Sequence, residues 1–317
     1  MPVPVLKVLR AGLMTTLQDL GRGGYQRFGV SPCGAMDPFA LRSGNRLVGN
    51  PDSSPCLELT LVGPDFLVLA DGLFAVTGGK VRVSLAGEPV PLWQAFSARR
   101  GDLLHLGVIR PGARCYLSTA GGFESERVFG SAATDSKAGW GGVEGRALVK
   151  GDVVWRAVEN PPTPGPIRTV RPQLLEAYHN PGLLRVVWGP QSEHFNQKNR
   201  KTFLASQFQV TPASNRMAYR LSGPPLKAEP PEILSDPIPP GSLQVLPNGQ
   251  MALLMADRQT IGGFPKIAVV ISADLPKAAQ LNLGESVRFL PVTLDLAHQL
   301  LLRQEEDLST SIVEATD

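Results

Sequence analysis

The densest group of side chains that could do chemistry is the segment 255–266, which reads MADRQTIGGFPK. Short apolar runs, 251–255 and 267–271, flank it and are typical of buried strands. Loops held between strands often carry binding and catalytic groups, and adjacent glycines can take positive φ and let a ligand approach the backbone. We therefore predict a functional loop, the alternative being a polar hairpin with solvated charges. Its candidate residues are Asp257, Arg258, Gln259, Thr260, Gly262, Gly263 and Lys266.

A second polar group lies near the N-terminus, in a glycine-rich segment over residues 15–37. Neither a helical nor a strand period fits this segment, and long irregular segments in compact domains are usually functional or disordered. Its interspersed apolar residues favour an ordered loop, and the alternative is an ordinary surface connection. The candidate site residues are Gln18, Asp19, Arg22, Gln26, Arg27 and Asp37. We expect the first three, and the 257–266 loop, to line grooves open to solvent or to a partner.

A third polar group occupies residues 214–221 and alternates like a strand. The alternation predicts Arg216 and Arg220 on one face and Tyr219 on the other. Two arginines on one face can clamp a carboxylate or phosphate, but structural pairing with an acidic residue is an equal alternative. The glycine-rich stretch 130–146 lacks P-loop spacing and is interpreted either as an anion-binding nest or as a plain rim loop.

Composition narrows the class of protein. The chain has 317 residues with 33 glycines and 29 prolines, which indicates many turns and therefore many short strands. The net charge of +3 and the absence of a basic stripe argue against nucleic-acid binding. No signal peptide or membrane-spanning stretch is evident, and the three cysteines and four histidines are scattered. We expect a cytoplasmic, metal-free protein.

The elements that must position the three groups are mostly strands. One clear helix is predicted over 37–50, with Asp37 as N-cap and Pro38 at the first helical position. A second is predicted over 294–307, followed by a frayed tail. Glu58, within an alternating strand, is either a site carboxylate or a solvent-facing residue. We predict an N-terminal domain at 1–160, a Pro-rich linker at 161–183, a C-terminal domain at 184–292 and a C-terminal helix and tail at 293–317.

Taken together, these segments resemble the family of 5-oxoprolinase C subunits, also called KipA or allophanate hydrolase subunit 2-like. The resemblance runs from about residue 5 to 291. Ala218 and Ile261 stand where the family pattern has Gly and Thr, and Phe264 stands where it has Tyr. The motifs that carry it are TLQDLGR (16–22), GAMD (34–37), NRLVGN (45–50), SNRMAYRL (214–221) and DRQTIGGFPK (257–266).

The resemblance implies a mostly β fold of tandem cyclophilin-like barrels. It also implies one component of an ATP-dependent hydrolase that converts 5-oxoproline to glutamate, with a KipI-like B subunit, a LamB/YcsF-like A subunit and ATP with Mg²⁺. On this interpretation Asp19, Arg22, Asp257 and Arg258 are predicted to be catalytic, and the remaining candidates to bind the substrate. One alternative is the carboxyltransferase subunit of a biotin-dependent urea carboxylase, with biotin arriving on another chain. The other is a regulatory protein that binds a KipI-type kinase inhibitor.

Overall fold

The computed structural model describes residues 1–159, 166–171, 174–175, 178 and 182–315. Contacts divide the chain into two compact units. Unit 1 comprises Met1–Arg22, Cys33–His179 and Asp307–Asp317, and unit 2 comprises Gly23–Pro32 and Asn180–Glu306. No helix in the described part of the chain is long and apolar enough to cross a membrane.

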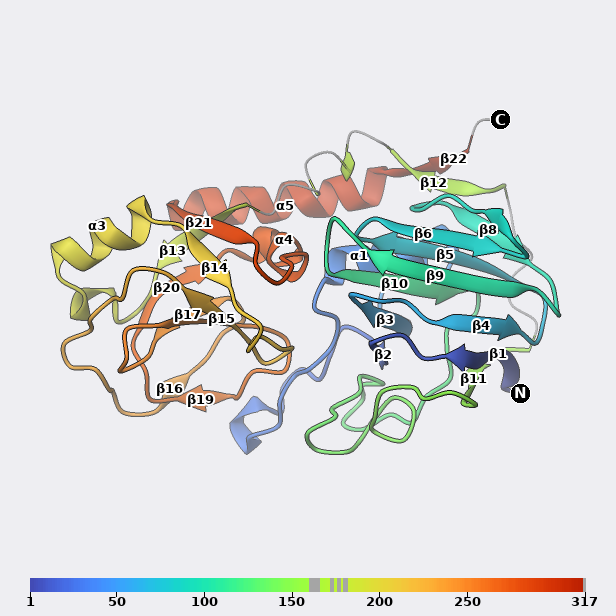
Figure 1. Cartoon of the computed structure of the whole chain (residues 1–317), viewed down its shortest axis with the longest axis horizontal. Coiled ribbons are helices and arrows are strands. Elements are labelled where there is room, and N and C mark those ends of the chain that lie inside the picture. The colour runs from blue at the N-terminus through green and yellow to red at the C-terminus, as the bar shows by residue number, and fades with distance from the viewer. Residues whose placement is uncertain (160–165, 172–173, 176–177, 179–181, 316–317) are drawn as a thin grey trace. The chain divides into compact units, whose positions relative to one another are not determined.

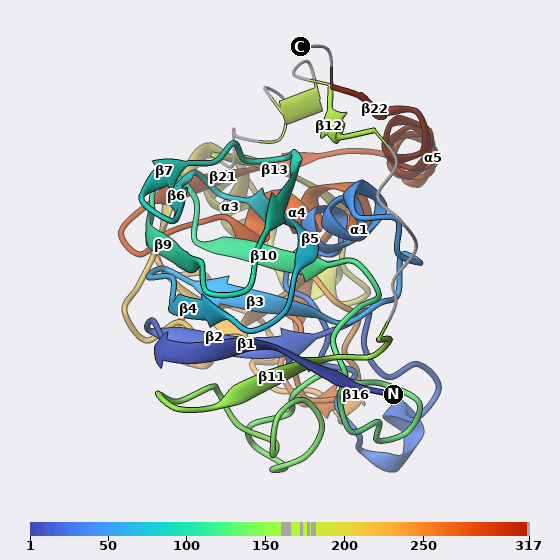
Figure 2. The same cartoon turned by 90° about the vertical axis from the view of Figure 1, so that its right-hand side faces the viewer.

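Unit 1 contains two main sheets and a small third one (Figures 1 and 2). One sheet has the strand order β11-β1-β4-β9-β6-β7, the second β2-β3-β10-β5-β8, and the third pairs β12 with β22. The strands are β1 (Val3–Arg10), β2 (Met14–Gln18), β3 (Cys56–Thr60), β4 (Asp65–Val68), β5 (Gly72–Gly78), β6 (Val81–Leu85), β7 (Glu88–Pro89), β8 (Ala95–Ala98), β9 (Leu103–Ile109), β10 (Arg114–Thr119), β11 (Val153–Arg156), β12 (Arg168–Val170) and β22 (Ile312–Glu314).

The main core of unit 1 is built from apolar residues of both sheets, such as Val8 and Phe66 from one and Leu59 and Leu117 from the other. A second core lies between the five-stranded sheet and helix α1 (Pro38–Leu47), which contacts β5 and β10. All six residues of β10 are buried, because its sheet is covered on both faces. The predicted helix is confirmed: Asp37 caps it by accepting from the backbone N–H of Ala40 at 2.9 Å, and Pro38 is at its start.

Unit 2 is a closed barrel of seven strands in the order β13-β20-β17-β18-β15-β14-β21, with β16 and β19 forming a separate two-stranded sheet. Its strands are β13 (Leu183–Trp188), β14 (Phe208–Val210), β15 (Ala218–Ser222), β16 (Asp236–Pro237), β17 (Ser242–Val245), β18 (Met251–Leu254), β19 (Ile261–Gly262), β20 (Lys266–Val270) and β21 (Ser286–Pro291). Its helical segments are η1 (Gln26–Phe28), η2 (Ser192–His194), α3 (Gln197–Ala205), η3 (Ser272–Asp274), α4 (Leu275–Ala279) and the first part of α5 (Leu294–Thr310).

Side-chain contacts fix the helices of unit 2 on the barrel. Phe203 of α3 stacks on Phe289 of β21 with ring centroids 4.9 Å apart. Asp274 of η3 accepts two side-chain bonds from Arg185 of β13, from Nε at 2.9 Å and from Nη2 at 2.5 Å. Burial would raise the pKa of Asp274, but the bonds from Arg185 outweigh it and leave that pKa below its ordinary value.

The predicted mostly β chain with few helices is confirmed. The predicted frayed tail is wrong in part: residues 312–314 form β22, which pairs antiparallel with β12. Most of the Pro-rich stretch 160–166 lies outside the described residues, and the proposed domain limits stay a prediction. Glu58 is buried rather than solvent-facing, because helix α1 and the chain before it cover that face of β3.

Candidate functional site

Three of the predicted residues form one group in unit 1, which we call the β2 cluster: Gln18, Asp19 and Arg22. The Asp19 carboxylate is buried and accepts three hydrogen bonds. Oδ1 accepts from the Gly21 N–H at 2.8 Å and the Ser131 hydroxyl at 2.6 Å, and Oδ2 accepts from the Ala132 N–H at 2.7 Å. The carboxylate therefore joins its own loop to the chain around residue 131.

Gln18 and Arg22 are also buried, and their side chains donate to the same stretch of backbone. Gln18 Nε2 lies 3.2 Å from the Thr134 carbonyl, and Arg22 donates to the carbonyls of Ala133 and Val128. Within the described part of the chain, Gln18 Oε1 and Arg22 Nη1 have no partner. The expectation that this cluster lines a groove is wrong for these side chains, because the 128–134 segment covers them and takes up most of their hydrogen-bonding groups.

The Gly-rich stretch 130–146 uses its polar side chains on its own backbone and on β2. Thr134 Oγ1 donates to the Leu17 carbonyl at 2.9 Å, and Asp135 Oδ1 accepts from the N–H groups of Lys137 and Ala138. These contacts favour the interpretation as a structural loop over an anion-binding nest.

Asp37 belongs to a separate buried network at the start of α1. Its carboxylate accepts from the Tyr178 hydroxyl, and its backbone N–H donates to the Tyr116 hydroxyl at 2.8 Å. Tyr116 in turn donates to Glu58 at 2.7 Å. Burial, with the nearby charge of Glu58, raises the pKa of Tyr116 well above its ordinary value. These contacts give Asp37 a structural task.

Gln26 and Arg27 lie on the short helix η1, within the segment that clusters with unit 2, and both are exposed. The Arg27 guanidinium is 4.7 Å from the ring centroid of Phe28, whose side chain is 67% exposed. Ser31, after η1, donates to the Arg258 carbonyl at 3.1 Å. These two predicted residues therefore lie on an exposed segment of unit 2 that is joined to the 255–266 loop.

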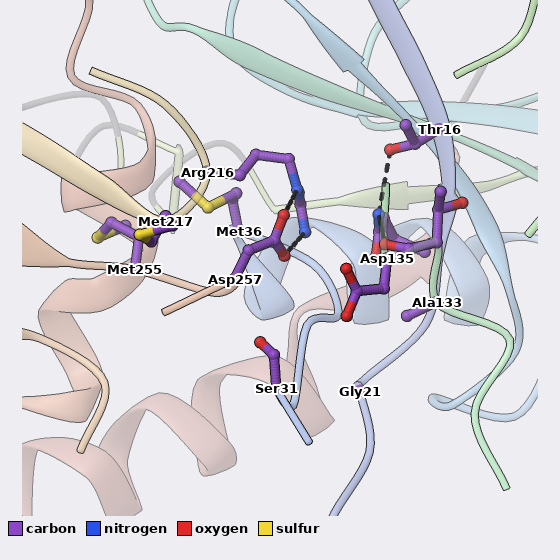
Figure 3. A network of polar contacts seen from close by, with 12 residues as sticks. Thr16, Gly21, Ser31, Met36, Ala133, Asp135, Arg216, Met217, Met255 and Asp257 are labelled. Carbon is purple, nitrogen blue, oxygen red and sulfur yellow. Dashed lines mark hydrogen bonds and ion pairs between the residues drawn. The ribbon is translucent and has the colours of Figure 1, made fainter. Parts of the chain in front are cut away.

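The second group of predicted residues lies in unit 2, where the 255–266 loop leaves the barrel. Figure 3 shows the Asp257 carboxylate facing the guanidinium of Arg216. The pair is bidentate, with Nε to Oδ2 and Nη2 to Oδ1 both at 2.9 Å. Arg216 is buried, whereas the Asp257 side chain is 24% exposed. Arg216 therefore follows the alternative of structural pairing with an acid, whereas Arg220 is exposed on β15.

Arg258 points into unit 2 rather than outward. Its Nε donates to the Ile238 carbonyl at 2.9 Å and its Nη1 to the Met255 carbonyl at 3.3 Å. Thr260 is nearly buried and Gln259 is exposed. Tyr219 is a core residue whose hydroxyl donates to the Ala279 carbonyl at 3.2 Å. Of these four predicted residues, only Gln259 presents its side chain to solvent.

Lys266, predicted to bind substrate, is buried at the start of β20. Its ammonium donates to Asp236 Oδ2 at 2.7 Å, and Gln191 Nε2 donates to the same oxygen at 3.1 Å. Sequence reasoning missed Asp236 and Gln191. Asp236 lies 30 residues before Lys266 in a short Ser-Asp-Pro segment with no other charged residue, so nothing in the sequence indicated the pair.

The two adjacent glycines do not use their freedom to take positive φ. Steric crowding explains the glycine at position 262 instead. A Cβ there would lie 2.7 Å from Ile238 Cδ1, 3.1 Å from Gln244 Nε2 and 3.3 Å from Gln259 Nε2. Gly263 has one close neighbour, the Ile233 carbonyl oxygen at 3.2 Å. Gly262 therefore permits a close approach of side chains to the backbone.

Comparison with known proteins gives the family. The model of the family described as carboxyltransferase domain, subdomain A and B, matches residues 28–291. The chain belongs to this family. It is 38% identical over 311 residues to the C subunit of 5-oxoprolinase from Escherichia coli (strain K12), covering 95% of each chain. It is 36% identical over 308 residues to the C subunit of 5-oxoprolinase from Haemophilus influenzae (strain ATCC 51907 / DSM 11121 / KW20 / Rd), covering 95% of this chain and 96% of the relative.

Among solved structures of this family, Kluyveromyces lactis urea carboxylase superposes with a TM-score of 0.88 at 31% identity. The similarity covers 99% of this chain but only 30% of the urea carboxylase chain. The family's fold therefore occurs both in a chain of this size and as one part of a much longer chain.

Proposed function

We propose that this chain is the C subunit of an ATP-dependent 5-oxoprolinase, which opens the lactam of 5-oxoproline to give glutamate. The observation that carries the proposal is the extent of the similarity to the two proteins that bear this name. At 38% and 36% identity, it covers about 95% of both chains in each pair. We further propose that a KipI-like B subunit and a LamB/YcsF-like A subunit complete the enzyme.

The chemistry of the substrate fits the groups that unit 2 presents. A lactam offers an N–H donor beside a carbonyl acceptor, and 5-oxoproline adds a carboxylate. Two partly exposed carboxylates, Asp236 and Asp257, are available as N–H acceptors, and the exposed Gln259 amide is available as a donor. Arg258, buried and bonded to backbone carbonyls, positions the loop in this proposal. In unit 1, we propose that Asp19 and Arg22 likewise position the chain around residues 128–132, to which they are hydrogen-bonded.

ATP with Mg²⁺ would supply the phosphoryl group that activates the lactam, and its charge would be neutralised by the metal. The described residues contain no group of three His, Cys, Asp or Glu side chains that could hold a metal ion. Mg²⁺ that arrives with a nucleotide is usually bound through one or two carboxylates together with the phosphates, so a dedicated cage in this chain is not required. We propose that the two partner proteins hold the nucleotide and its Mg²⁺.

A second candidate function is the carboxyltransferase step of a biotin-dependent urea carboxylase. It is favoured by the superposition on urea carboxylase, with a TM-score of 0.88 over 99% of this chain. The ureido ring of biotin also presents N–H beside C=O, so the same acceptors and donor fit it. In that case biotin would arrive on another chain and would supply the carboxylate to be transferred.

The test is reconstitution. This chain, its KipI-like partner and the co-expressed pair are each purified, mixed with the LamB/YcsF-like protein and assayed for ATP hydrolysis that depends on 5-oxoproline. We expect turnover only with the complete set, and a stable pair that buries about 1,600 Å² or more. Turnover with urea and carboxybiotin, but not with 5-oxoproline, would favour the second candidate. A pair that never co-purifies would contradict the subunit role.

A further inference from the structure

Lys266, Asp236 and Gln191 form a hydrogen-bonded group in unit 2 that joins three different elements. Lys266 begins β20, Asp236 begins β16, and Gln191 precedes η2. Both Lys266 Nζ, at 2.7 Å, and Gln191 Nε2, at 3.1 Å, donate to the same oxygen, Asp236 Oδ2. Gln191 Oε1 also accepts from the Lys266 backbone N–H at 3.2 Å, which fixes the glutamine in turn.

The two charges of this group differ in exposure. The Lys266 side chain is 1% exposed and the Asp236 side chain 38%. A buried ammonium needs a counter-charge, so the hydrogen bond from Lys266 fixes the position of the Asp236 carboxylate. The hydrogen bond from Lys266, with that from Gln191, holds the pKa of Asp236 below its ordinary value. Asp236 Oδ1 makes no hydrogen bond to any of the described residues. The group thus offers one fixed, ionised and partly exposed acceptor.

An amide donor lies close to the residue that pairs with Asp236. Asp236 is directly opposite Gly262 in the antiparallel pairing of β16 with β19. An ideal Cβ on Gly262 would be 3.3 Å from the amide nitrogen of Gln259. Residues directly opposite in an antiparallel pair have Cβ positions about 4.5–5.5 Å apart. The Gln259 amide therefore lies close to the residue opposite Asp236, and an acceptor beside an amide donor matches the N–H and C=O that a cyclic amide presents side by side.

We propose that Asp236 contacts the substrate, accepting the lactam N–H through Oδ1 while the Gln259 amide donates to the neighbouring carbonyl oxygen. Lys266 and Gln191 are then positioning residues that hold Asp236 in place. This inference rests on the 5-oxoprolinase function proposed above. It adds a contact between this chain and one specific bond of the substrate.

The test measures recognition of that N–H in the reconstituted enzyme. The KM for 5-oxoproline is compared with the inhibition constant of the γ-lactone that carries ring oxygen in place of N–H. In the wild type the lactone loses the hydrogen bond and places its ring oxygen against a carboxylate, so we expect the lactam to be preferred by about 10-fold or more. The double variant D236A/K266M removes both charges and so leaves no buried ammonium unpaired. In this variant the preference for the lactam should fall below about 3-fold, and KM for 5-oxoproline should rise by a larger factor than kcat falls.

Two further variants keep the result interpretable. D236E preserves the charge opposite Lys266 but moves the oxygens by one methylene, so it should fold and still lose most of the preference. E229Q makes a matched change in the exposed Lys227–Glu229 pair and should leave the preference unchanged. If D236A/K266M and D236E both fold and keep the wild-type preference for the lactam over the lactone, the contact between Asp236 and the lactam N–H is overturned, but the proposed function is not. No 5-oxoproline-dependent turnover in the wild-type assembly would overturn the proposed function and this contact with it.

Discussion

Replacing Asp19 by asparagine tests whether the carboxylate of the β2 cluster is structural. In the folded chain Asp19 accepts hydrogen bonds from two backbone N–H groups and one hydroxyl. Asparagine keeps one oxygen but turns an N–H₂ group toward the other position. If the oxygen stays with Gly21 and Ser131, the new amide nitrogen faces the backbone N–H of Ala132, and two donors oppose each other in a buried place.

The magnitude follows from the bonds lost. A hydrogen bond to a charged group contributes about 1.5–3 kcal/mol, and a buried donor left unsatisfied costs about 1–3 kcal/mol. Together these predict that D19N lowers the free energy of unfolding of unit 1 by about 3 kcal/mol or more. S131A removes one donor to the carboxylate and one acceptor for the Ala133 N–H, so it should cost about 1–2 kcal/mol.

Urea denaturation followed by tryptophan fluorescence is a suitable assay. The chain has four tryptophans, and in a W188F background the remaining three, Trp93, Trp140 and Trp155, all lie in unit 1. D71N is the matched control, because Asp71 is exposed in the same unit and accepts from the Arg100 N–H at 2.7 Å. If D19N proved as stable as D71N, our account of the carboxylate would be refuted. A stable but inactive D19N enzyme would place Asp19 in the chemistry instead.

Three further predictions concern unit 2. Gly189→Ala should lower the free energy of unfolding by about 3 kcal/mol in urea denaturation, because the added Cβ would lie 2.1 Å from the Lys266 carbonyl oxygen. The matched control is Gly23→Ala, whose Cβ would have no heavy atom within 4 Å, and it should change this free energy by less than about 0.5 kcal/mol. Arg258→Ala should lower the free energy of unfolding by about 3 kcal/mol in the same assay, because it removes a buried guanidinium that donates to two backbone carbonyls. Because Arg258 positions the loop in the proposed enzyme, the same change should lower turnover about 100-fold. An unchanged denaturation midpoint would contradict the structural part of this prediction. The pKa of Asp274 is lower in the folded chain, so its contribution to stability is present above about pH 4 and is lost as pH falls through the folded-state pKa. In D274N this contribution is absent, so the free energy of unfolding should fall less steeply below about pH 4 than in the wild type.

Local sequence signals located much of the structure. The helix after Asp37 followed from a capping residue and a proline, both of which act within one turn, and the strands followed from short apolar runs. The position of the 255–266 loop between two strands also followed from such runs. These features depend on neighbouring residues, which is why the sequence alone was sufficient.

Pairing across the fold was not predictable in the same way. The sequence left open whether Arg216 clamps a ligand or pairs with an acid, because Asp257 is 41 residues away and meets it only when the barrel closes. The Lys266–Asp236 pair was missed for the same reason. Arg22 was expected to line an open groove, yet it is 1% exposed beneath a glycine-rich loop that no local pattern could place over it.

The arrangement of charges has a consequence for the proposed enzyme. Arg22, Arg216 and Arg258, three of the predicted site arginines, are buried and donate to backbone carbonyls or to Asp257. A guanidinium held in this way is a poor partner for an incoming phosphate, because it is buried and most of its donors are already engaged. Two carboxylates near these arginines and Lys266 remain partly exposed, Asp236 and Asp257, and both are hydrogen-bond acceptors. They suit the N–H of an amide and would repel a phosphate. In the proposed enzyme these groups therefore suit the lactam better than ATP, and the cations that neutralise the phosphates should come from other, exposed arginines or from the partner proteins.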